Sequence, residues 1–457
     1  MFQTFEVNLP NLKKEEFPIT AYGAVKGGEV SNTKAFAEAI AAATERGGRV
    51  VVPDGMWLTG PIELKSGVEL HLEDNAVILF SKNPEEYPLI VTDFEGIRRI
   101  RTVSPISAKD ASDIAITGNG VIDGNGHLWR PVKSFKVTAR QWDELLKESP
   151  YVIESKEGGI WVPTKSIYDG RYHGEVYPAG DEVAEAAALN EAALEEATPY
   201  YDFYRPVMVH LHNCERVLIE NVTVQNSPAW CLHPHFCKHL TIKGVRVNNP
   251  YHAQNGDALD VESCENVEIC YCTFSAGDDG ICIKSGKDKE ARKIPGPCQN
   301  IHVHHCKVGY GHGGFVIGSE MSRGVRNVLV EDCTFINSDV GLRFKSAMGR
   351  GGVVEDIYIR RINMLNLKKE VAIFTMNYVL NTMDYEDAVV KSEDPEDIPE
   401  FRNVYIEDCC AKGAQMVLKV QGLEGKPDTI HDIYIKNCDF EAKEENSLKN
   451  CRDIVIM

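Results

Sequence analysis

Four short polar clusters between residues 255 and 345 carry the residue types that acid–base chemistry needs. They read Asn-Gly-Asp at 255–257 with Asp260 close behind, Gly-Asp-Asp-Gly at 277–280, Gly-His-Gly-Gly at 311–314 and Arg-Phe-Lys at 343–345. Crowded carboxylates repel one another, so one of them should keep its proton near neutral pH while a neighbour stays ionised. A protonated acid beside an ionised base is the pair that glycosidic bond cleavage requires. The clusters therefore predict a reaction centre.

Each cluster also has a plainer interpretation. An aspartate beside glycine is usually a turn residue. Taken alone, His312 reads as a turn histidine, and Arg343 and Lys345 read as surface cations. Their order along successive repeats makes this interpretation the weaker one. We expect His312 to set the protonation of an aspartate, and Arg343 to bind a carboxylate through two parallel hydrogen bonds.

A repeating strand pattern supplies the scaffold. Short alternating segments begin at Val68, Ile114, Val217, Leu240, Val267, Ile301, Val328, Ile357, Val404, Ile433 and Ile454. Most of the later starts lie about 21 to 34 residues apart, which is too short for a propeller blade. These segments also lack the helices of a leucine-rich horseshoe. The pattern therefore predicts an all-β fold, a right-handed parallel β-helix with three short strands in each coil.

The spacing of the clusters predicts where they meet. In a β-helix, residues at the same phase of consecutive coils lie about 4.8 Å apart. Asp257 and Asp278 are close to one coil apart in sequence, and His312 and Arg343 follow at about one further coil each, allowing for an insertion. We expect the four clusters to share one phase and one groove. Phe344 should point inward, so that Arg343 and Lys345 both face the groove.

The whole chain, residues 1–457, is expected to form one β-helix domain with an N-terminal cap at 18–60. Within the cap, a helix from Asn32 to Arg46 should bury an apolar face and end at Gly47, with Asn32 or Ser31 as its cap. Such a helix protects the open end of a stack of strands.

Long spacings predict three insertions that leave the coil. The largest, 124–206, contains Trp129, Trp142 and Trp161 and a helix-like run from Asp181 to Ala197. The second, 287–297, is rich in lysine and arginine and should add positive charge near the aspartates. The third, 377–400, ends in an acidic tract from Asp384 that predicts a solvated loop.

The net charge of −19 argues against nucleic acid and anionic membranes as partners. An acidic substrate would therefore need locally placed cations, since screening confines the repulsion to about 8 Å. No apolar stretch approaches the roughly 20 residues of a membrane span, and no leader is visible at the N-terminus. We expect a cytoplasmic protein, or a secreted or periplasmic one if a leader precedes this sequence. An export signal on the natural precursor would contradict the first expectation.

The cysteines predict a packed ladder instead of a disulfide framework. Of fourteen, five fall five residues after a repeat's first apolar residue: Cys272, Cys306, Cys333, Cys409 and Cys438. Aliphatic residues occupy the same position in other repeats, so we interpret these cysteines as small apolar side chains. A reduced column fits a reducing compartment. No group of cysteines and histidines has zinc-type spacing.

At these four clusters the sequence resembles glycoside hydrolase family 28, the polygalacturonases. The family's Asn-Thr-Asp motif appears as Asn255-Gly-Asp, and its Asp-Asp as Asp278-Asp279. Its Gly-His-Gly appears around His312, and its Arg-Ile-Lys as Arg343-Phe-Lys. Gly256 for Thr, Phe344 for Ile and Ala258 for Gly depart from the pattern without removing a catalytic group. The resemblance covers most of the chain, including Gly47-Gly-Arg-Val-Val-Val-Pro.

The resemblance implies inverting hydrolysis of an α-1,4-linked galacturonate bond without a cofactor or a metal. It makes Asp278 the general acid, lets Asp257 and Asp279 activate water, and has His312 tune the acid. The substrate-binding residues it implies are Asn255, Lys284, Arg343, Lys345 and Tyr378. Lys284 lies in the stretch Ile283-Lys-Ser-Gly-Lys-Asp, which, with Gly313-Gly-Phe-Val-Ile-Gly-Ser-Glu-Met-Ser, resembles the exo-acting bacterial branch. In that branch extra loops block one end of the groove, a role that suits 124–206.

The sequence leaves several alternatives open. The substrate is expected to be a pectic oligo- or polysaccharide of galacturonate, but rhamnogalacturonan or another pectic side-chain bond is the nearest alternative. A calcium-dependent pectate lyase on the same fold fits the aspartates and His312 less well. A non-catalytic carbohydrate-binding solenoid would need aromatic platforms without aligned carboxylates. Exposed coil edges would permit a homo-oligomer, and nothing in the sequence specifies one.

Overall fold

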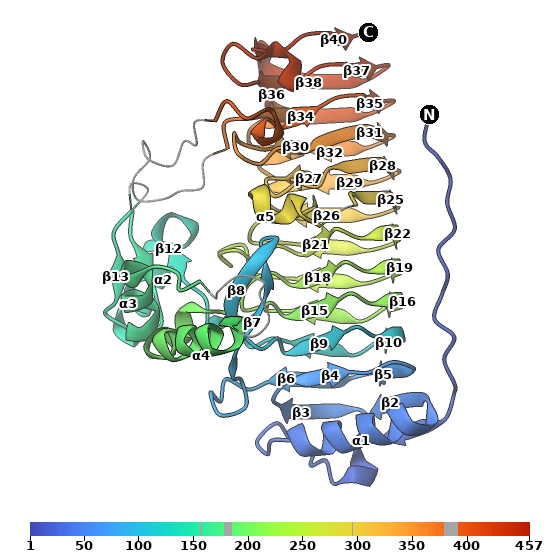
Figure 1. The fold of residues 1–457 in the computed structure, drawn as a ribbon, viewed down its shortest axis with the longest axis vertical. Coiled ribbons are helices and arrows are strands. Elements are labelled where there is room, and N and C mark those ends of the chain that lie inside the picture. Colours follow the sequence, from blue (N-terminus) through green and yellow to red (C-terminus); the bar gives the residue numbers. More distant parts are fainter. Residues whose placement is uncertain (156–157, 178–184, 295, 379–391) are drawn as a thin grey trace.

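The chain winds into a parallel β-helix (Figure 1). The structure is a computed structural model that describes residues 1–155, 158–177, 185–294, 296–378 and 392–457. One sheet is built from β1 (Glu16–Pro18), β2 (Gly48–Val52), β5 (Val68–Leu72), β10 (Ser112–Gly118), β16 (Glu215–Glu220), β19 (Lys238–Lys243), β22 (Glu265–Cys270), β25 (Cys298–His304), β28 (Val325–Glu331), β31 (Val353–Arg360), β35 (Val404–Glu407), β37 (Ile433–Lys436) and β40 (Ile454–Ile456), with β34 (Glu400–Phe401) beside β31.

Two further ladders complete each coil, so three strands make one turn as predicted. One contains β11 (Val121–Asp123), β17 (Thr223–Gln225), β20 (Arg246–Asn248), β23 (Thr273–Ser275), β26 (Lys307–Tyr310), β29 (Thr334–Ile336) and β32 (Asn363–Leu365). The other contains β9 (Ile106–Lys109), β15 (Val209–His212), β18 (Leu232–His235), β21 (Leu259–Glu262), β24 (Ile281–Lys284), β27 (Gly313–Gly318), β30 (Val340–Lys345) and β33 (Glu370–Thr375). The candidate site residues lie on or beside this last ladder.

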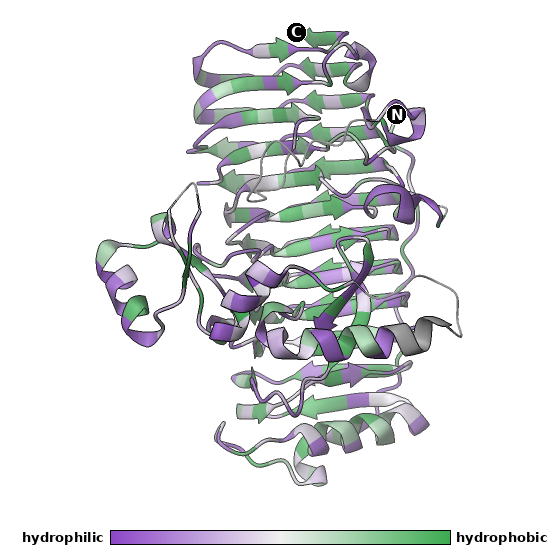
Figure 2. Cartoon of the chain, turned by 60° about the vertical axis from the view of Figure 1, so that its left-hand side comes forward, coloured by the Kyte–Doolittle hydropathy of each residue, from purple (hydrophilic) through white to green (hydrophobic). Residues whose placement is uncertain are grey.

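The register confirms the predicted repeat. Val217 pairs with Leu240, and Leu240 pairs in turn with Val267. The same first apolar residues continue in register through the sheet to Ile454. Each predicted strand start therefore stacks on the next one, because alternate apolar side chains must all enter the core between the sheets. Figure 2 shows hydrophobic residues concentrated on the strands and hydrophilic ones on the turns between them.

The cysteines form the predicted ladder, and all fourteen are free. In that column the thiols donate to nearby carbonyls, for example Cys272 to Cys270 at 3.2 Å. A second column, which we did not predict, consists of Cys214, Cys237, Cys264 and Cys298, all buried. The signal was in the sequence, since each precedes a strand start by the same short interval.

The N-terminal cap contains the predicted helix, α1 (Thr33–Arg46), which buries Phe36 and Ile40 and ends at Gly47. Asn32 occupies the N-cap position, but its side chain makes no capping hydrogen bond. It accepts from Val25 N at 2.6 Å and donates to Leu58 O at 3.0 Å instead. The asparagine therefore joins the preceding loop to β3 (Gly55–Thr59), a use of its amide that local sequence does not reveal.

Several segments leave the coil. The 124–206 insertion carries α2 (Ala139–Glu148), α3 (Lys165–His173), α4 (Glu185–Ala197) and a small sheet of β12 (Val132–Lys133), β13 (Val152–Ile153) and β14 (Ile160–Trp161). The predicted acidic-alanine helix is thus α4, and residues 181–184 lie outside the described part of the chain. An antiparallel hairpin, β7 (Leu89–Phe94) and β8 (Ile97–Thr102), was not predicted. The tract from Asp384 to 391 also lies outside the described residues.

We predicted that the 287–297 insertion adds positive charge near the aspartates, and this prediction is wrong because carboxylates neutralise its cations. This segment contains α5 (Asp288–Arg292), and its cations are paired with carboxylates. Arg292 lies 2.5 Å from Asp397, and Lys289 lies 3.5 Å from the same residue. Acidic partners supplied by distant loops therefore neutralise a segment that is basic in sequence.

The first fifteen residues run along the outside of the coils as an extended strap (Figure 1). Asn11 N donates to Asp113 at 2.9 Å near one end of the stack, and Gln3 N donates to Asn327 Oδ1 at 2.9 Å many coils away. Asn327 Nδ2 donates back to Gln3 O at 2.8 Å. The strap therefore ties together coils that otherwise contact only their neighbours. No helix of the described chain is long and apolar enough to cross a membrane.

Deleting residues 2–12 should lower the midpoint of thermal unfolding, because each lost hydrogen bond removes about 1 kcal/mol. In the full chain, Asn327→Ala should destabilise more than in the truncated chain, where Gln3 is already gone. Differential scanning calorimetry of the full chain and the truncated chain, each with and without Asn327→Ala, measures how strongly the effect of the substitution depends on the strap. Equal effects of Asn327→Ala in both backgrounds would show that the strap does not hold the coils together.

Candidate active site

The strand register places Asp257 opposite Asp279. Ala258 N donates to Asp279 O at 3.0 Å, and Leu259 pairs with Ile281. Asp257 and Asp278 are therefore close to one coil apart, as predicted, but the residue in register with Asp257 is Asp279. Asp278 faces the next coil instead, where His312 N donates to its carbonyl oxygen at 2.6 Å.

Arg343 and Lys345 do not share the phase of Asp257 and Asp279, which corrects the expectation of one phase for all clusters. Arg343 pairs with Val316, which in turn pairs with Cys282 inside β24. The two cations reach the site because their side chains are long enough to extend back across the coils. Phe344, between them, is fully buried and stacks on Phe374 at 4.4 Å between ring centroids, as predicted.

Asp279 lies at the centre of this charge arrangement. Arg343 Nη1 lies 3.1 Å from its Oδ1, and Lys345 Nζ lies 2.6 Å from its Oδ2. Burial alone would raise the pKa of Asp279, but the charges of Lys345 and then Arg343 outweigh it and lower that pKa. Asp279 is therefore held as a carboxylate, the form that a general base needs.

Asp278 is paired with His312. The histidine Nδ1 lies 2.9 Å from Asp278 Oδ1. Burial raises the pKa of Asp278, but His312, followed by Lys345 and Lys136, holds it well below its usual range. Asp278 is thus a carboxylate in this structure, hydrogen-bonded to His312 and close to the charges of Lys345 and Lys136.

The proton expected on one of the crowded aspartates lies elsewhere in the free enzyme. Burial, followed by repulsion from Asp260 and Asp278, raises the pKa of Asp257 well above its ordinary value. Burial likewise raises the pKa of Asp260 to about 8. No donor among the described residues binds Asp257 Oδ1 or either oxygen of Asp260. Repulsion does sort the aspartates into protonated and ionised members, as predicted, but Asp278 is on the ionised side.

Lys284 lies beneath the aspartates and is 3% exposed. Its Nζ donates to Glu320 Oε2 at 2.8 Å and lies 3.6 Å from Asp260 Oδ1. It also sits 4.6 Å from the centre of the Trp230 ring. Its ammonium is therefore engaged by buried carboxylates, and its predicted contact with substrate stays a prediction.

Asn255 and Tyr378 are both close to the site. Asn255 Oδ1 accepts from Arg205 Nη2 at 2.9 Å, so the end of the 124–206 insertion fixes this side chain. The Tyr378 ring lies 5.0 Å from Lys345 Nζ and 5.8 Å from Arg343 Cζ. The tyrosine thus covers the two cations, where a sugar ring bound to them would meet it.

One oxygen from each of Asp257, Asp278 and Asp279 lies within 4.8 Å of the others, a grouping that could hold a metal ion. Both Asp279 oxygens already bind cationic side chains, and Asp278 binds His312. A metal ion would have to compete with these contacts. The protein's own cations therefore supply the positive charge at this site.

Histidines 210, 212 and 235 form a second grouping with nitrogen atoms close enough to hold an ion. Their neighbour His233 lies 2.8 Å from Glu262 through Nε2 and 3.0 Å from His210 through Nδ1. If His233 donates to Glu262, His210 must donate to His233. This hydrogen-bonded chain engages Nδ1 of His210, one of the three histidines of the grouping.

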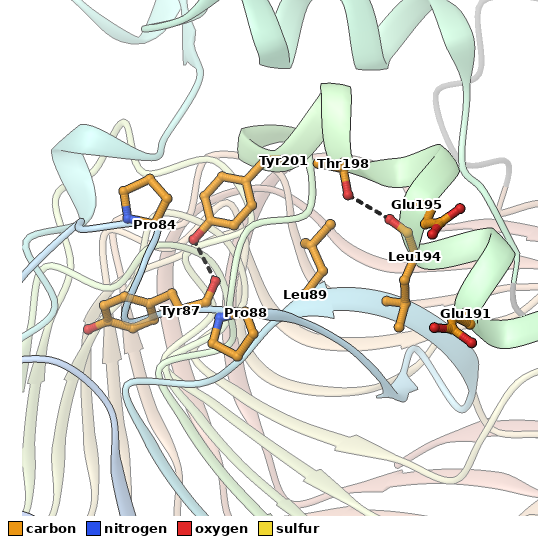
Figure 3. Close-up of a pocket in the computed structure, with 9 residues that line it drawn as sticks. All are labelled: Pro84, Tyr87, Pro88, Leu89, Glu191, Leu194, Glu195, Thr198 and Tyr201. Carbon is orange, nitrogen blue, oxygen red and sulfur yellow. Dashed lines mark hydrogen bonds between the residues drawn. The ribbon is translucent and has the colours of Figure 1, made fainter. Parts of the chain in front are cut away.

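A hollow of about 620 Å³ lies apart from these residues, between α4 and the segment before β7 (Figure 3). Apolar and acidic side chains line it, and it contains none of the catalytic aspartates. Its lining residues are Pro84, Tyr87, Pro88, Leu89, Glu191, Leu194, Glu195, Thr198 and Tyr201.

Comparison with known proteins decides which chemistry this geometry serves. A family model described as Glycosyl hydrolases family 28 matches residues 202–452, more than half of the chain. The chain belongs to glycosyl hydrolase family 28. It is therefore a glycoside hydrolase, as the resemblance implied.

Relatives of this family 28 enzyme extend over nearly its whole length. An exo-poly-alpha-D-galacturonosidase of Dickeya chrysanthemi is 31% identical over 95% of this chain and 69% of that protein. A probable polygalacturonase of Vitis vinifera is 26% identical over 99% and 80%. The crystal structure of a hyperthermoactive exopolygalacturonase from Thermotoga maritima superposes with a TM-score of 0.76 at 30% identity, covering 98% of this chain and 94% of that one.

Sequence reasoning missed several residues of the family 28 site. Lys136 and Arg205 come from the insertion, and nothing in a repeat pattern says where an insertion folds back. Trp230 lies in a coil whose strand was recognised but whose turn was not analysed. Glu320 lies in the stretch that resembles the exo-acting branch, but no role was predicted for it. The β7–β8 hairpin did leave a signal, since the strand starts at Val68 and Ile114 are far apart.

Lys345→Met should shift the acid limb of the kcat/KM profile to higher pH. Lys345 lowers the pKa of Asp279, so its removal raises that pKa, and the carboxylate is lost to protonation at a higher pH. Activity should also fall about tenfold or more, since a hydrogen bond to a charged group contributes about 1.5–3 kcal/mol. Lys345→Arg should preserve the limb. If the kcat/KM pH profiles of Lys345→Met and the unaltered enzyme coincide, Asp279 is not the general base.

Proposed function

We propose that the enzyme is an exo-polygalacturonase that hydrolyses α-1,4-galacturonosyl bonds and releases galacturonate from chain ends. The observation that carries this proposal is the β7–β8 hairpin, which leaves the coil and lies beside β15 and β18 (Figure 1). Those strands belong to the coils directly before Asp257. The exo-acting relatives in Dickeya and Thermotoga support the same substrate class.

The hairpin is held against this face by specific contacts. Asp93 Oδ2 lies 3.8 Å from His212 Nδ1, and the Phe94 and Trp230 ring centroids are 4.6 Å apart. At the hairpin tip, Glu95 lies 3.7 Å from Lys287 Nζ. A polysaccharide lying over the aspartates would therefore meet the hairpin on the N-terminal side. It could extend only past Arg343 and Lys345.

The charges of the site support recognition of a uronic acid. Arg343 and Lys345 present two cations beside the aspartates in a chain of net charge −19. A bound sugar carboxylate would cancel part of their field, and the proton affinity of Asp278 would rise. Asp278 would then gain the proton it lacks in the free enzyme. Substrate binding would thereby prepare the general acid.

In this mechanism Asp278 protonates the glycosidic oxygen as the bond to the anomeric carbon breaks. Asp279, assisted by Asp257, accepts a proton from the water that attacks that carbon. The two carboxylates nearest the bond lie closer together than the roughly 6.5–9.5 Å typical of inverting enzymes. Inversion is therefore proposed from the family resemblance and needs its own measurement.

Digestion of trigalacturonate and of long polygalacturonate should release monomer from the outset, without unsaturated ends. Asp278→Asn should lower kcat by about 100-fold or more, the scale of general acid catalysis. Chromatography gives the product sizes, and proton NMR of fresh product should show the β-anomer if the configuration inverts.

Other outcomes would separate the alternatives. Mid-sized oligomers at early times would make the action internal. Unsaturated products that disappear with a chelator would indicate a lyase. A folded enzyme that releases nothing from either substrate would redirect the search to rhamnose-containing pectin.

Replacing residues 90–101 by a short glycine-serine turn should convert end-wise release into internal cleavage. Mid-sized oligomers should then appear early, because the face before Asp257 is uncovered. A replacement of similar size within the strap, at residues 2–12, serves as the control and should keep monomer as the first product. If the hairpin variant folds and still releases only monomer, the hairpin does not close this face.

A further inference from the structure

The 124–206 insertion brings a lysine to the catalytic histidine. Lys136 ends the short helical turn Ser134–Lys136, and its Nζ lies 3.0 Å from His312 Nε2. The same ammonium donates to Gly277 O at 2.7 Å. The other ring nitrogen of His312, Nδ1, lies 2.9 Å from Asp278. His312 is thus placed between an ammonium group and a carboxylate.

These contacts determine where the histidine carries its proton. An ammonium has only hydrogens to offer, so the Nε2 atom facing Lys136 must accept. Nδ1 then carries the single hydrogen and donates it to Asp278 Oδ1. A second proton, placed on Nε2, would put a positively charged imidazolium N–H against the Lys136 ammonium, whose nitrogen is 3.0 Å away, and the two charges would repel each other. Lys136 therefore favours a neutral His312 with its hydrogen on Nδ1.

We propose that Lys136 is a positioning residue that directs the catalytic proton to Asp278 and away from His312. The pair of Asp278 and neutral His312 can take up one proton in two places. Taken up on Nε2, it produces an imidazolium beside a carboxylate, and Asp278 cannot act as the acid. Lys136 disfavours a proton at both places, but it contacts Nε2 directly at 3.0 Å and therefore opposes a proton there more strongly than on the Asp278 carboxylate. Of the two places, the carboxyl group is then the one that takes the proton.

The proposal rests on the proposed function, and its proton balance follows from it. Asp278 gives the proton to the glycosidic oxygen as the bond breaks, and it remains as a carboxylate that accepts from His312 Nδ1. The attacking water gives a proton to the base, from which solvent removes it. Asp278 is then reprotonated from solvent. His312 keeps its Nδ1 hydrogen throughout, and Lys136 transfers no proton.

Lys136 could instead serve only as a support for the Gly277 turn, since it also binds that carbonyl. A change of tautomer distinguishes the two roles, because loss of a support would lower activity without moving a proton. Burial lowers the pKa of Lys136, although Asp278 opposes this effect. The three hydrogens of the ammonium form have acceptors in His312 Nε2, Gly277 O and Tyr251 O, so the contacts fit the charged form.

The test compares Lys136→Met with Lys136→Arg and with Lys147→Met, which removes the same charge from an exposed position on α2. Nitrogen-15 NMR of the histidine rings reports the tautomer of His312, assigned by the signals that a His312→Asn variant loses. This measurement needs no substrate, so it stands even if the galacturonate assignment fails. kcat and its pH profile on polygalacturonate form the second arm.

In Lys136→Met, Nε2 of His312 should take up a hydrogen because the ammonium group no longer faces it, and kcat should fall by about 10- to 100-fold, the scale for loss of an outer hydrogen-bond partner. Lys136→Arg should keep the Nδ1 tautomer and most of kcat, and Lys147→Met should match the unaltered enzyme. If the two ring nitrogens of His312 carry hydrogen in the same way in a folded Lys136→Met as in the unaltered enzyme, the proposal is overturned. So would an equal loss of activity in Lys147→Met.

Discussion

Parallel pairing between consecutive coils is the constraint on which the rest of the structure depends. Backbone hydrogen bonds fix each coil about 4.8 Å from the next. The register then decides which side chains become neighbours. It places Asp257 opposite Asp279 and leaves Asp278 to His312. A shift of one residue in this ladder would turn the aspartates toward the core, so the catalytic geometry follows directly from the packing of the strands.

Crowding carboxylates on such a ladder is unfavourable unless the surrounding charges differ from one to the next. Asp279 is stabilised by Arg343 and Lys345, whereas Asp257 has no donor at Oδ1 within the described structure. The result is a set of equivalent residues with unequal proton affinities. The positive charge that sets these proton affinities comes from the side chains of Arg343 and Lys345. A negatively charged substrate that binds them can therefore change the proton affinities of the aspartates. Binding and proton transfer are then coupled through one electrostatic field.

The segments that leave the coil bring further side chains to the active site and cover part of the face beside it. A bare β-helix offers an open face along its length, which suits cleavage inside a polymer. Here the β7–β8 hairpin packs Phe94 against Trp230, and the 124–206 insertion contributes Arg205 and Lys136. In the proposed mechanism, substrate access and the tautomer of His312 therefore depend on elements outside the repeat. Such insertions can vary without disturbing the ladder, since loops at coil corners break no strand pairing.

The sequence by itself determined the coil repeat, the capping helix, the inward Phe344 and the set of aspartates, histidine and cations that meet. These follow from local periodicity, because each strand start stacks on the next. It did not determine which aspartate faces which, since a difference of one residue between turns is invisible in spacing. It did not reveal that Glu95 and Asp397 neutralise the 287–297 segment. It also could not place Lys136 beside His312. These contacts join residues far apart in the chain, and only tertiary packing brings them together.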